Sequence, residues 1–249
     1  MLNFFDARCQ LGRRGVVREG QPITKEDILE LMERCNIEKA VAYHSIALEG
    51  DMKGGNEELL KDTAGDDRFV RQWCAMPSAF GEFMSVEELL TQMKANDVSS
   101  VRLFPKTHGF SLKPYAMGKF MAAMAEHKIP VFMTYAESGT DDALYALLTD
   151  YPEVNFVISD VSYREERKMF PILQQCKNIY LGTGNYVVHG GIKTMCRYFG
   201  AERLIFDTGL PVGSATSAVS LVCYAEISRE EKELIAHGNL ERLLSGVTL

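Results

Sequence analysis

Long apolar runs, basic clusters and secretory features are all missing from this sequence of 249 residues. Without a run of about 18 apolar residues, no segment is predicted to span a membrane, and the first residues lack the basic and apolar regions of a signal peptide. The net charge is −7, and Lys and Arg gather no further than the pair Arg13 and Arg14. A nucleic-acid partner needs a basic face. We therefore expect a cytoplasmic protein with neither nucleic acid nor membrane as a partner.

The sequence also has no closely spaced pair of cysteines and few histidines. The six cysteines form no Cys-x-x-Cys motif, and most lie in apolar stretches, as reduced core thiols do. Only five histidines are present, which leaves few imidazoles for a metal site.

Short apolar runs alternate with helical patterns along the whole chain. Helix starts are marked by N-cap residues: Thr24, Ser85, Thr140, and Ser228 with Glu231 in a capping box. The predicted strands are Leu2–Asp6, Ala40–His44, Phe69–Met76, Ser99–Phe104, Val131–Tyr135, Asn155–Asp160, Ile179–Gly182 and Arg203–Thr208. Eight strands at a spacing of roughly 30 residues are typical of a (β/α)8 TIM barrel. An open doubly wound sheet is the alternative, but no glycine-rich phosphate turn follows the first strand. We predict a single domain over residues 1–249.

Four segments along the chain have sequences and an order that can be compared with known families. Asp6 to Gly12 (DARCQLG) is interpreted as a turn after the first strand; Val101 to Pro105 (VRLFP), Glu202 to Pro211 (ERLIFDTGLP) and His237 to Leu244 (HGNLERLL) follow. Together they resemble the amidohydrolase superfamily, in its amidohydrolase-related branch of decarboxylases and lactonases.

The resemblance implies a TIM barrel with a divalent metal held by histidines and served by a catalytic aspartate. In this chain the four histidine positions carry other residues, and the aspartate position is a glycine: Arg8, Gln10, Thr134, Asp160 and Gly209. A guanidinium has no lone pair to give a metal and carries its own positive charge. The sequence therefore predicts a barrel without the usual metal and without a cofactor.

Charged residues nevertheless gather where the barrel mouth is expected. If the chain stays extended, Asp6, Arg8 and Gln10 share one face and Cys9 points away. We hypothesise that Arg8 takes the place of the lost cation and neutralises Asp160 and Asp207, within about 6 Å of at least one of them. The alternative is a structural salt bridge with no substrate.

Three further residues are candidates for the site. Arg102 is a cation inside an apolar strand, and the resemblance implies a clamp for a substrate carboxylate; a purely structural pair is the alternative. His44 ends the second strand, where it could act as a general acid or be a hydrogen-bonded core histidine. His108 lies in the loop after the fourth strand, at the expected rim.

The leading hypothesis is a metal-independent hydrolase or lyase acting on a small carboxylate-bearing molecule. Asp160 or Asp207 would be the general base and His44 the acid, with the substrate bound by Arg8, Gln10, Arg102, Thr134 and His108. Two alternatives stay open: a catalytically inactive ligand-binding or regulatory barrel, and a metal-dependent hydrolase with displaced ligands. A homodimer is the default expectation for such a barrel.

Overall fold

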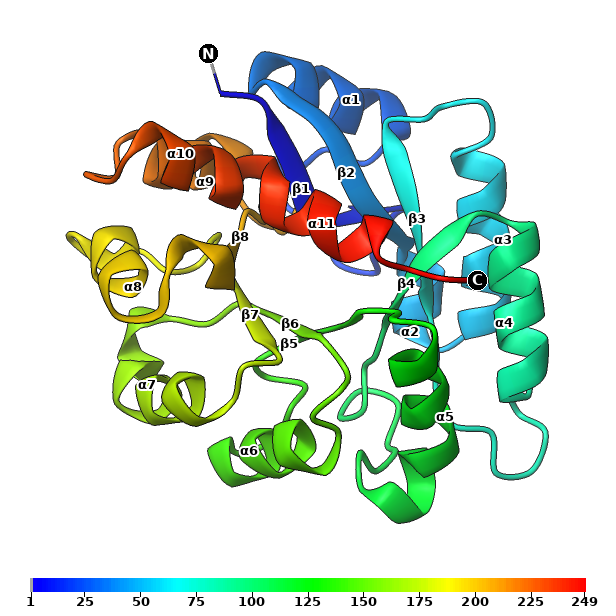
Figure 1. Cartoon of the computed structure of the whole chain (residues 1–249). Helices are drawn as coiled ribbons and strands as arrows, with labels where there is room; N and C mark the ends of the chain where they lie inside the picture. The colour runs from blue at the N-terminus through cyan, green and yellow to red at the C-terminus, as the bar shows by residue number, and fades with distance from the viewer. Residues whose placement is uncertain (1) are drawn as a thin grey trace.

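The chain folds into a ring of parallel strands with helices outside it. The computed structural model describes residues 2–249, and its eight-stranded sheet follows the order β1 to β8, each strand pairing in parallel with the next (Figure 1). The strands are β1 (Phe4–Leu11), β2 (Ile37–His44), β3 (Phe69–Cys74), β4 (Val98–Arg102), β5 (Val131–Thr134), β6 (Phe156–Ser159), β7 (Ile179–Gly182) and β8 (Leu204–Ile205). Helices separate the successive strands, so the predicted (β/α)8 barrel is confirmed.

The four predicted N-caps, Thr24, Ser85, Thr140 and Ser228, each precede a helix. Thr24 and Asp27 form a capping box, as do Ser228 and Glu231. The α-helices are α1 (Lys25–Arg34), α2 (Ser45–Glu49), α3 (Met52–Asp62), α4 (Val86–Ala95), α5 (Pro114–Glu126), α6 (Asp141–Asp150), α7 (Glu166–Gln175), α8 (Gly191–Phe199), α9 (Ala215–Cys223), α10 (Arg229–Glu233) and α11 (Asn239–Ser245). Two short 3-10 helices are η1 (Tyr163–Glu165) and η2 (Ala201–Arg203), and η3 (Leu234–Gly238) is a π-helix.

Individual backbone bonds, rather than a long ladder, close the ring between the last strand and the first. β8 is only two residues long, shorter than the predicted Arg203–Thr208. Beyond it, Ala7 N–H donates to the Phe206 carbonyl at 3.0 Å and Gln10 N–H to the Leu210 carbonyl at 2.9 Å. The segment after β8 therefore continues along β1 up to the barrel mouth.

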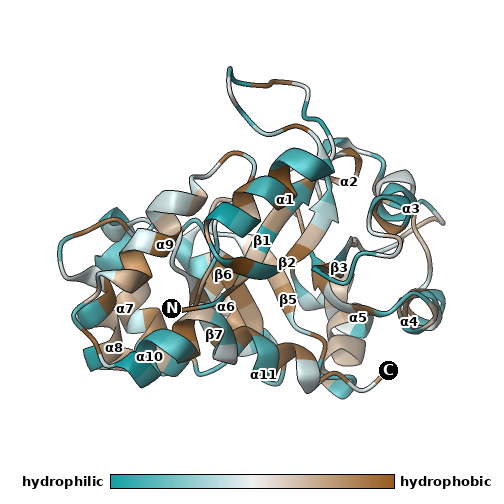
Figure 2. Cartoon of the chain, turned by 90° about the horizontal axis from the view of Figure 1, so that it is seen from above, coloured by the Kyte–Doolittle hydropathy of each residue, from teal (hydrophilic) through white to brown (hydrophobic). Residues whose placement is uncertain are grey.

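Two apolar layers hold the barrel together. The larger layer lies between the strands and the surrounding helices, while a smaller one fills the barrel interior. The inner layer consists of Phe5, Ala7, Val41, Phe132, Val157 and Ile205, packed with Leu240 and Leu243 of α11. In Figure 1, α11 crosses the strands, and the hydropathy colours of Figure 2 place hydrophilic residues on outer helices such as α10. Since several inner residues lie near the starts of their strands, α11 covers that end, and the opposite end forms the mouth.

The sequence-based prediction ends the first strand too early. The segment Asp6 to Gly12, interpreted as a turn, lies in β1 as far as Leu11, because pairing with β2 continues to Leu11 opposite His44. Within residues 2–249, no helix combines the length and the apolar character needed to cross a membrane.

Candidate active site

A cavity of about 330 Å³ opens at the carboxyl ends of the strands, where barrel enzymes carry their active sites. We call it the mouth cavity. Its lining residues are Arg8, Gln10, Arg14, Tyr43, Leu48, Phe104, Thr107, Thr134, Glu137, Asp160, Gly209, Leu210, Val212 and Gly213. Four of the predicted site residues are therefore together here: Arg8, Gln10, Thr134 and Asp160.

A β-bulge in β1 decides which side chains reach this cavity. Between Asp6 and Cys9 the register with β2 shifts by one residue, so two residues of β1 stand opposite Val41 alone. The extra residue reverses the alternation of faces. Arg8 and Gln10 line the mouth cavity, whereas Cys9 belongs to the outer apolar layer. The prediction that Asp6 shares their face is wrong, since simple alternation does not hold across the bulge.

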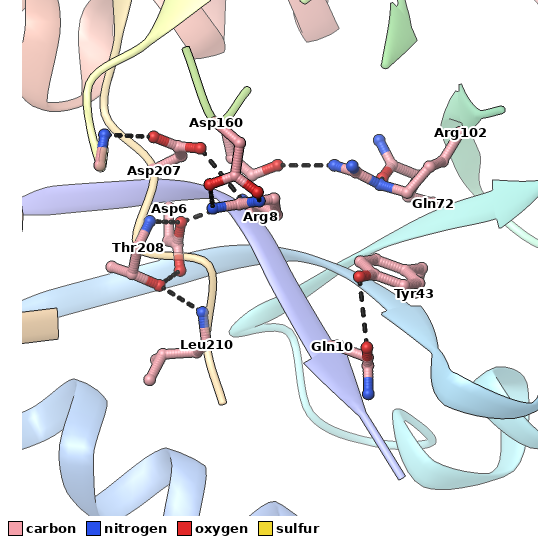
Figure 3. A network of polar contacts seen from close by, with 12 residues as sticks. Asp6, Arg8, Gln10, Tyr43, Gln72, Arg102, Asp160, Asp207, Thr208 and Leu210 are labelled. Atoms are coloured by element: carbon pink, nitrogen blue, oxygen red, sulfur yellow. Dashed lines mark hydrogen bonds and ion pairs between the residues drawn. The ribbon is translucent and has the colours of Figure 1, made fainter. Parts of the chain in front are cut away.

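Arg8 forms ion pairs with both predicted carboxylates. Its Nη1 lies 2.5 Å from Asp160 Oδ2 and its Nη2 donates to Asp160 Oδ1 at 2.8 Å, while Nε lies 3.3 Å from Asp207 Oδ2. Figure 3 shows the guanidinium between the two acids. Burial opposes the charge on Arg8, but Asp207 and Asp160 outweigh it and hold its pKa above the usual value. The pairing predicted from the sequence is present, well inside the range of about 6 Å within which such charges couple.

Glycines make the room that this ion pair needs. A Cβ on Gly209 would lie 2.3 Å from Arg8 Nη2, so no larger residue fits there while Arg8 keeps its place. A Cβ on Gly182 would lie 2.7 Å from the Asp207 carboxyl carbon. Asp207 Oδ1 accepts a hydrogen bond from Gly184 N–H at 2.6 Å. Gly209 and Arg8 are therefore sterically matched, because the Arg8 guanidinium occupies the space that a side chain at position 209 would need.

Asp6 lies behind Arg8, where the first and last strands meet. Its Oδ1 accepts hydrogen bonds from Arg8 N–H at 2.9 Å and Thr208 N–H at 2.8 Å, and its Oδ2 accepts from the Thr208 hydroxyl at 2.5 Å. Burial raises the Asp6 pKa to about 7, against the lowering effect of these bonds. Because β8 is so short, this carboxylate replaces part of the missing ladder and fixes the backbone beside Gly209.

Arg102 lies inside the barrel rather than at the cavity surface. It is fully buried, and its Nε donates to Gln72 Oε1 at 2.6 Å while its Nη2 reaches the Ala7 carbonyl at 3.4 Å. Its guanidinium carbon lies 4.8 Å from the ring centre of Tyr43, which does line the cavity. Burial lowers the Arg102 pKa. Arg102 does not line the cavity. It can therefore influence a ligand there only through its contact with Tyr43 or through the electric field of its charge.

The two predicted histidines lie beside the cavity and do not line it. His44 caps α2: its Nδ1 accepts from Ile46 N–H at 3.2 Å and its Nε2 lies 3.4 Å from Asp62 Oδ2. Burial lowers the His44 pKa, partly offset by Asp62. His108 Nε2 bonds the Leu48 carbonyl at 2.9 Å. Both imidazoles therefore form hydrogen bonds to backbone groups, His44 to Ile46 N–H and His108 to the Leu48 carbonyl.

Five polar or aromatic lining residues were not predicted from the sequence: Arg14, Tyr43, Phe104, Thr107 and Glu137. Phe104 ends a predicted strand and Tyr43 is the next-to-last residue of another, so their position near strand ends could have indicated them. Arg14 and Glu137 lie on loops, and no periodic pattern predicts which way a loop side chain points.

With this geometry established, comparison with known proteins identifies the family. The sequence profile of the amidohydrolase family matches residues 18–245. The chain belongs to this family. Among curated proteins, none matches the chain.

Solved structures with the same fold cover nearly the whole chain. An uncharacterised TIM-barrel protein from Bordetella bronchiseptica is 17% identical, with a TM-score of 0.78 over 98% of this chain and 99% of that one. A 5-carboxyvanillate decarboxylase from Sphingomonas paucimobilis is 10% identical, with a TM-score of 0.73 over 100% of both chains. A dihydroxybenzoic acid decarboxylase from Polaromonas, which holds manganese and 2-nitroresorcinol, is 14% identical, with a TM-score of 0.73 over 98% and 97%. At these identities the likeness shows the fold.

The residues of this mouth do not fit a divalent metal. The guanidinium of Arg8 pairs with Asp160 and Asp207, the carboxylates that a metal ion would need as ligands. A guanidinium cannot itself be a ligand. Across residues 2–249, no three His, Cys, Asp or Glu side chains come together as a metal site. An aspartate at position 209 would collide with Arg8. The usual metal of the fold family therefore has no matching ligand set here.

Proposed function

We propose that this chain is a metal-independent hydrolase or lyase acting on a small carboxylate-bearing molecule bound in the mouth cavity. The observation that carries the proposal is the Arg8 guanidinium, paired with Asp160 and Asp207 at the mouth of an amidohydrolase-family barrel. A fixed positive charge in a partly dry site can stabilise negative charge that develops during a reaction. The name of the Sphingomonas neighbour describes a decarboxylase of a carboxylate substrate, which supports the substrate class.

In this proposal the two aspartates have different roles. The Asp160 side chain is 41% exposed, and the residue lines the cavity with a left-handed backbone, φ 60°, so it is the carboxylate that can exchange a proton with a substrate. Asp207 is fully covered and does not line the cavity. Its role is to hold Arg8, and Arg8 in turn orients Asp160.

Arg14 is the best-placed cation for the substrate carboxylate. It lines the cavity, and within residues 2–249 it forms no ion pair, whereas Arg8 is already doubly paired. Gln10 and Thr134 line the same cavity and supply neutral polar contacts. A guanidinium matches a carboxylate in shape and charge, so Arg14 extends the predicted set of substrate-binding residues.

Metal analysis combined with a substrate screen tests the proposal. Protein purified without chelators is analysed for metals and screened for hydrolysis and decarboxylation of small carboxylates, with and without EDTA. We expect far less than one metal per chain, turnover unaffected by EDTA, and a loss of at least about 100-fold in Asp160→Asn, the scale of a lost general base. One metal per chain, with activity that chelation removes and metal restores, would overturn the proposal in favour of displaced metal ligands.

A ligand-binding barrel without catalysis is the second candidate. It is favoured by the mutual neutralisation of Arg8 and the two acids, which leaves no strongly reactive group free. Calorimetry separates the two functions. A binding protein would give only the heat of binding and would release the carboxylate unchanged, whereas an enzyme would give continuing heat as the substrate is converted.

A further inference from the structure

A second cavity lies directly behind one wall of the mouth cavity. This distal cavity, of about 260 Å³, is lined by Pro105, Phe110, Leu112, Ala143 and Leu147 among others, and it shares Glu137 with the mouth cavity. The intervening wall is the segment after β4. Phe104 and Thr107 line the mouth side, whereas Pro105 and Lys106 line the distal side.

Glu137 holds this wall in place from the neighbouring strand end. Its Oε2 accepts hydrogen bonds from Lys106 N–H at 2.8 Å and Thr107 N–H at 3.1 Å, and its Oε1 accepts from the Thr107 hydroxyl at 2.6 Å. With both oxygens engaged, Glu137 fixes the wall at the border between the two cavities.

Several polar groups that line the distal cavity already have partners. Ser138 Oγ donates to the Tyr135 carbonyl at 2.7 Å, and Ser111 Oγ accepts from Lys113 N–H at 3.2 Å. Lys113 Nζ lies 4.0 Å from Asp150 Oδ2. An occupant therefore meets mainly apolar surface, in contrast to the charged mouth cavity.

We infer that the ligand is a carboxylic acid with an apolar arm: its carboxylate lies in the mouth cavity, and its arm crosses the outer edge of the wall beside Glu137 and lies in the distal cavity. This inference rests on the proposed function, which places a carboxylate in the mouth. It adds the length and the apolar character of the part of the ligand beyond its carboxylate, which neither the family nor the residues of the mouth cavity define.

A chain-length series tests the inference. Binding of butanoate, hexanoate, octanoate and decanoate is measured by calorimetry on the wild type, on Ala143→Phe, which fills the distal cavity, and on the milder Ala143→Leu. We expect wild-type affinity to rise about two- to fourfold for each added methylene that becomes buried. In Ala143→Phe this gain should disappear, while affinity for the shortest acid that binds stays within about twofold of the wild type.

Ala146→Phe is the matched control, because Ala146 lies one turn further along α6 and does not line the distal cavity. It should keep the wild-type length dependence. Equal length dependence in the wild type and in both Ala143 variants, with folding verified by circular dichroism, would overturn the inference and leave the proposed function standing. Wild-type protein that binds none of the four acids at 10 mM would instead count against the proposed carboxylate site itself.

Discussion

Replacing Gly209 with alanine should disturb Arg8 far more than the small added volume suggests. The new Cβ would lie 2.3 Å from Arg8 Nη2 and 2.9 Å from its Cζ, so the guanidinium must move. The backbone at Gly209 has φ +69°, a left-handed conformation that costs an L-residue about 1–2 kcal/mol. Gly190→Ala is a matched control, because Gly190 has φ +65° with no atom within 4 Å of its ideal Cβ.

The excess cost of Gly209→Ala over this control comes from the ion pairs of Arg8. Complete loss of a partner by a buried charge such as Asp207 costs about 3–5 kcal/mol, whereas the Asp160 pair is half-exposed and contributes about 1 kcal/mol or less. A methyl group displaces Arg8 without removing it. We therefore expect an excess of about 1–3 kcal/mol, a fraction of that full loss.

Urea unfolding of four proteins measures this coupling: the wild type, Gly209→Ala, Arg8→Ala and the double variant. In the Arg8→Ala background, Gly209→Ala should cost only what Gly190→Ala costs in the wild type, since nothing remains to collide with the methyl group. The cycle then gives a coupling energy of about 1–3 kcal/mol, within the usual range for residues in contact. If Gly209→Ala costs the same with and without Arg8, the two residues are not interdependent and the reasoning fails.

Three further outcomes follow from the same geometry. Asp6 has a folded-state pKa of about 7 against 3.8 as its ordinary value, so the folded state holds its proton more tightly. The stability this provides is complete below about pH 4 and is lost as the pH rises to about 7. Wild-type stability relative to Asp6→Asn should therefore fall by about 3 kcal/mol between pH 5 and pH 8 in urea titrations; a difference that does not change with pH would contradict it. Asp207→Asn should lower unfolding free energy by about 2–4 kcal/mol, because it leaves the buried side of Arg8 without its charge, whereas Asp160→Asn should cost under about 1 kcal/mol. Reversal of that order, measured by the same unfolding assay, would refute the assignment of Asp207 as the buried anchor. Arg102→Met should cost less stability than Arg8→Ala, since no carboxylate is left unpaired by it, and thermal melting compares the two directly.

The local sequence predicts the overall fold, and it also shows residues other than histidine where the resemblance implies metal ligands. Alternating apolar runs and N-caps such as Thr24 and Ser228 act over a few residues, so they indicate strands, helix starts and hence the barrel without knowledge of the rest of the chain. Residue identity alone shows that Arg8 cannot bind a metal. The need to neutralise buried charge predicted its pairing with Asp160 and Asp207.

Only the tertiary structure decided how these residues are arranged at the mouth. The bulge in β1 depends on its register with β2, which moved Asp6 off the face of Arg8. The burial of Arg102 beneath Tyr43, and the use of His44 as a helix cap, depend on packing between distant segments. The same holds for Arg14 and Glu137, which reach the cavity from loops. A single sequence records which charges must be compensated; the partner that each one finds is set by non-local contacts.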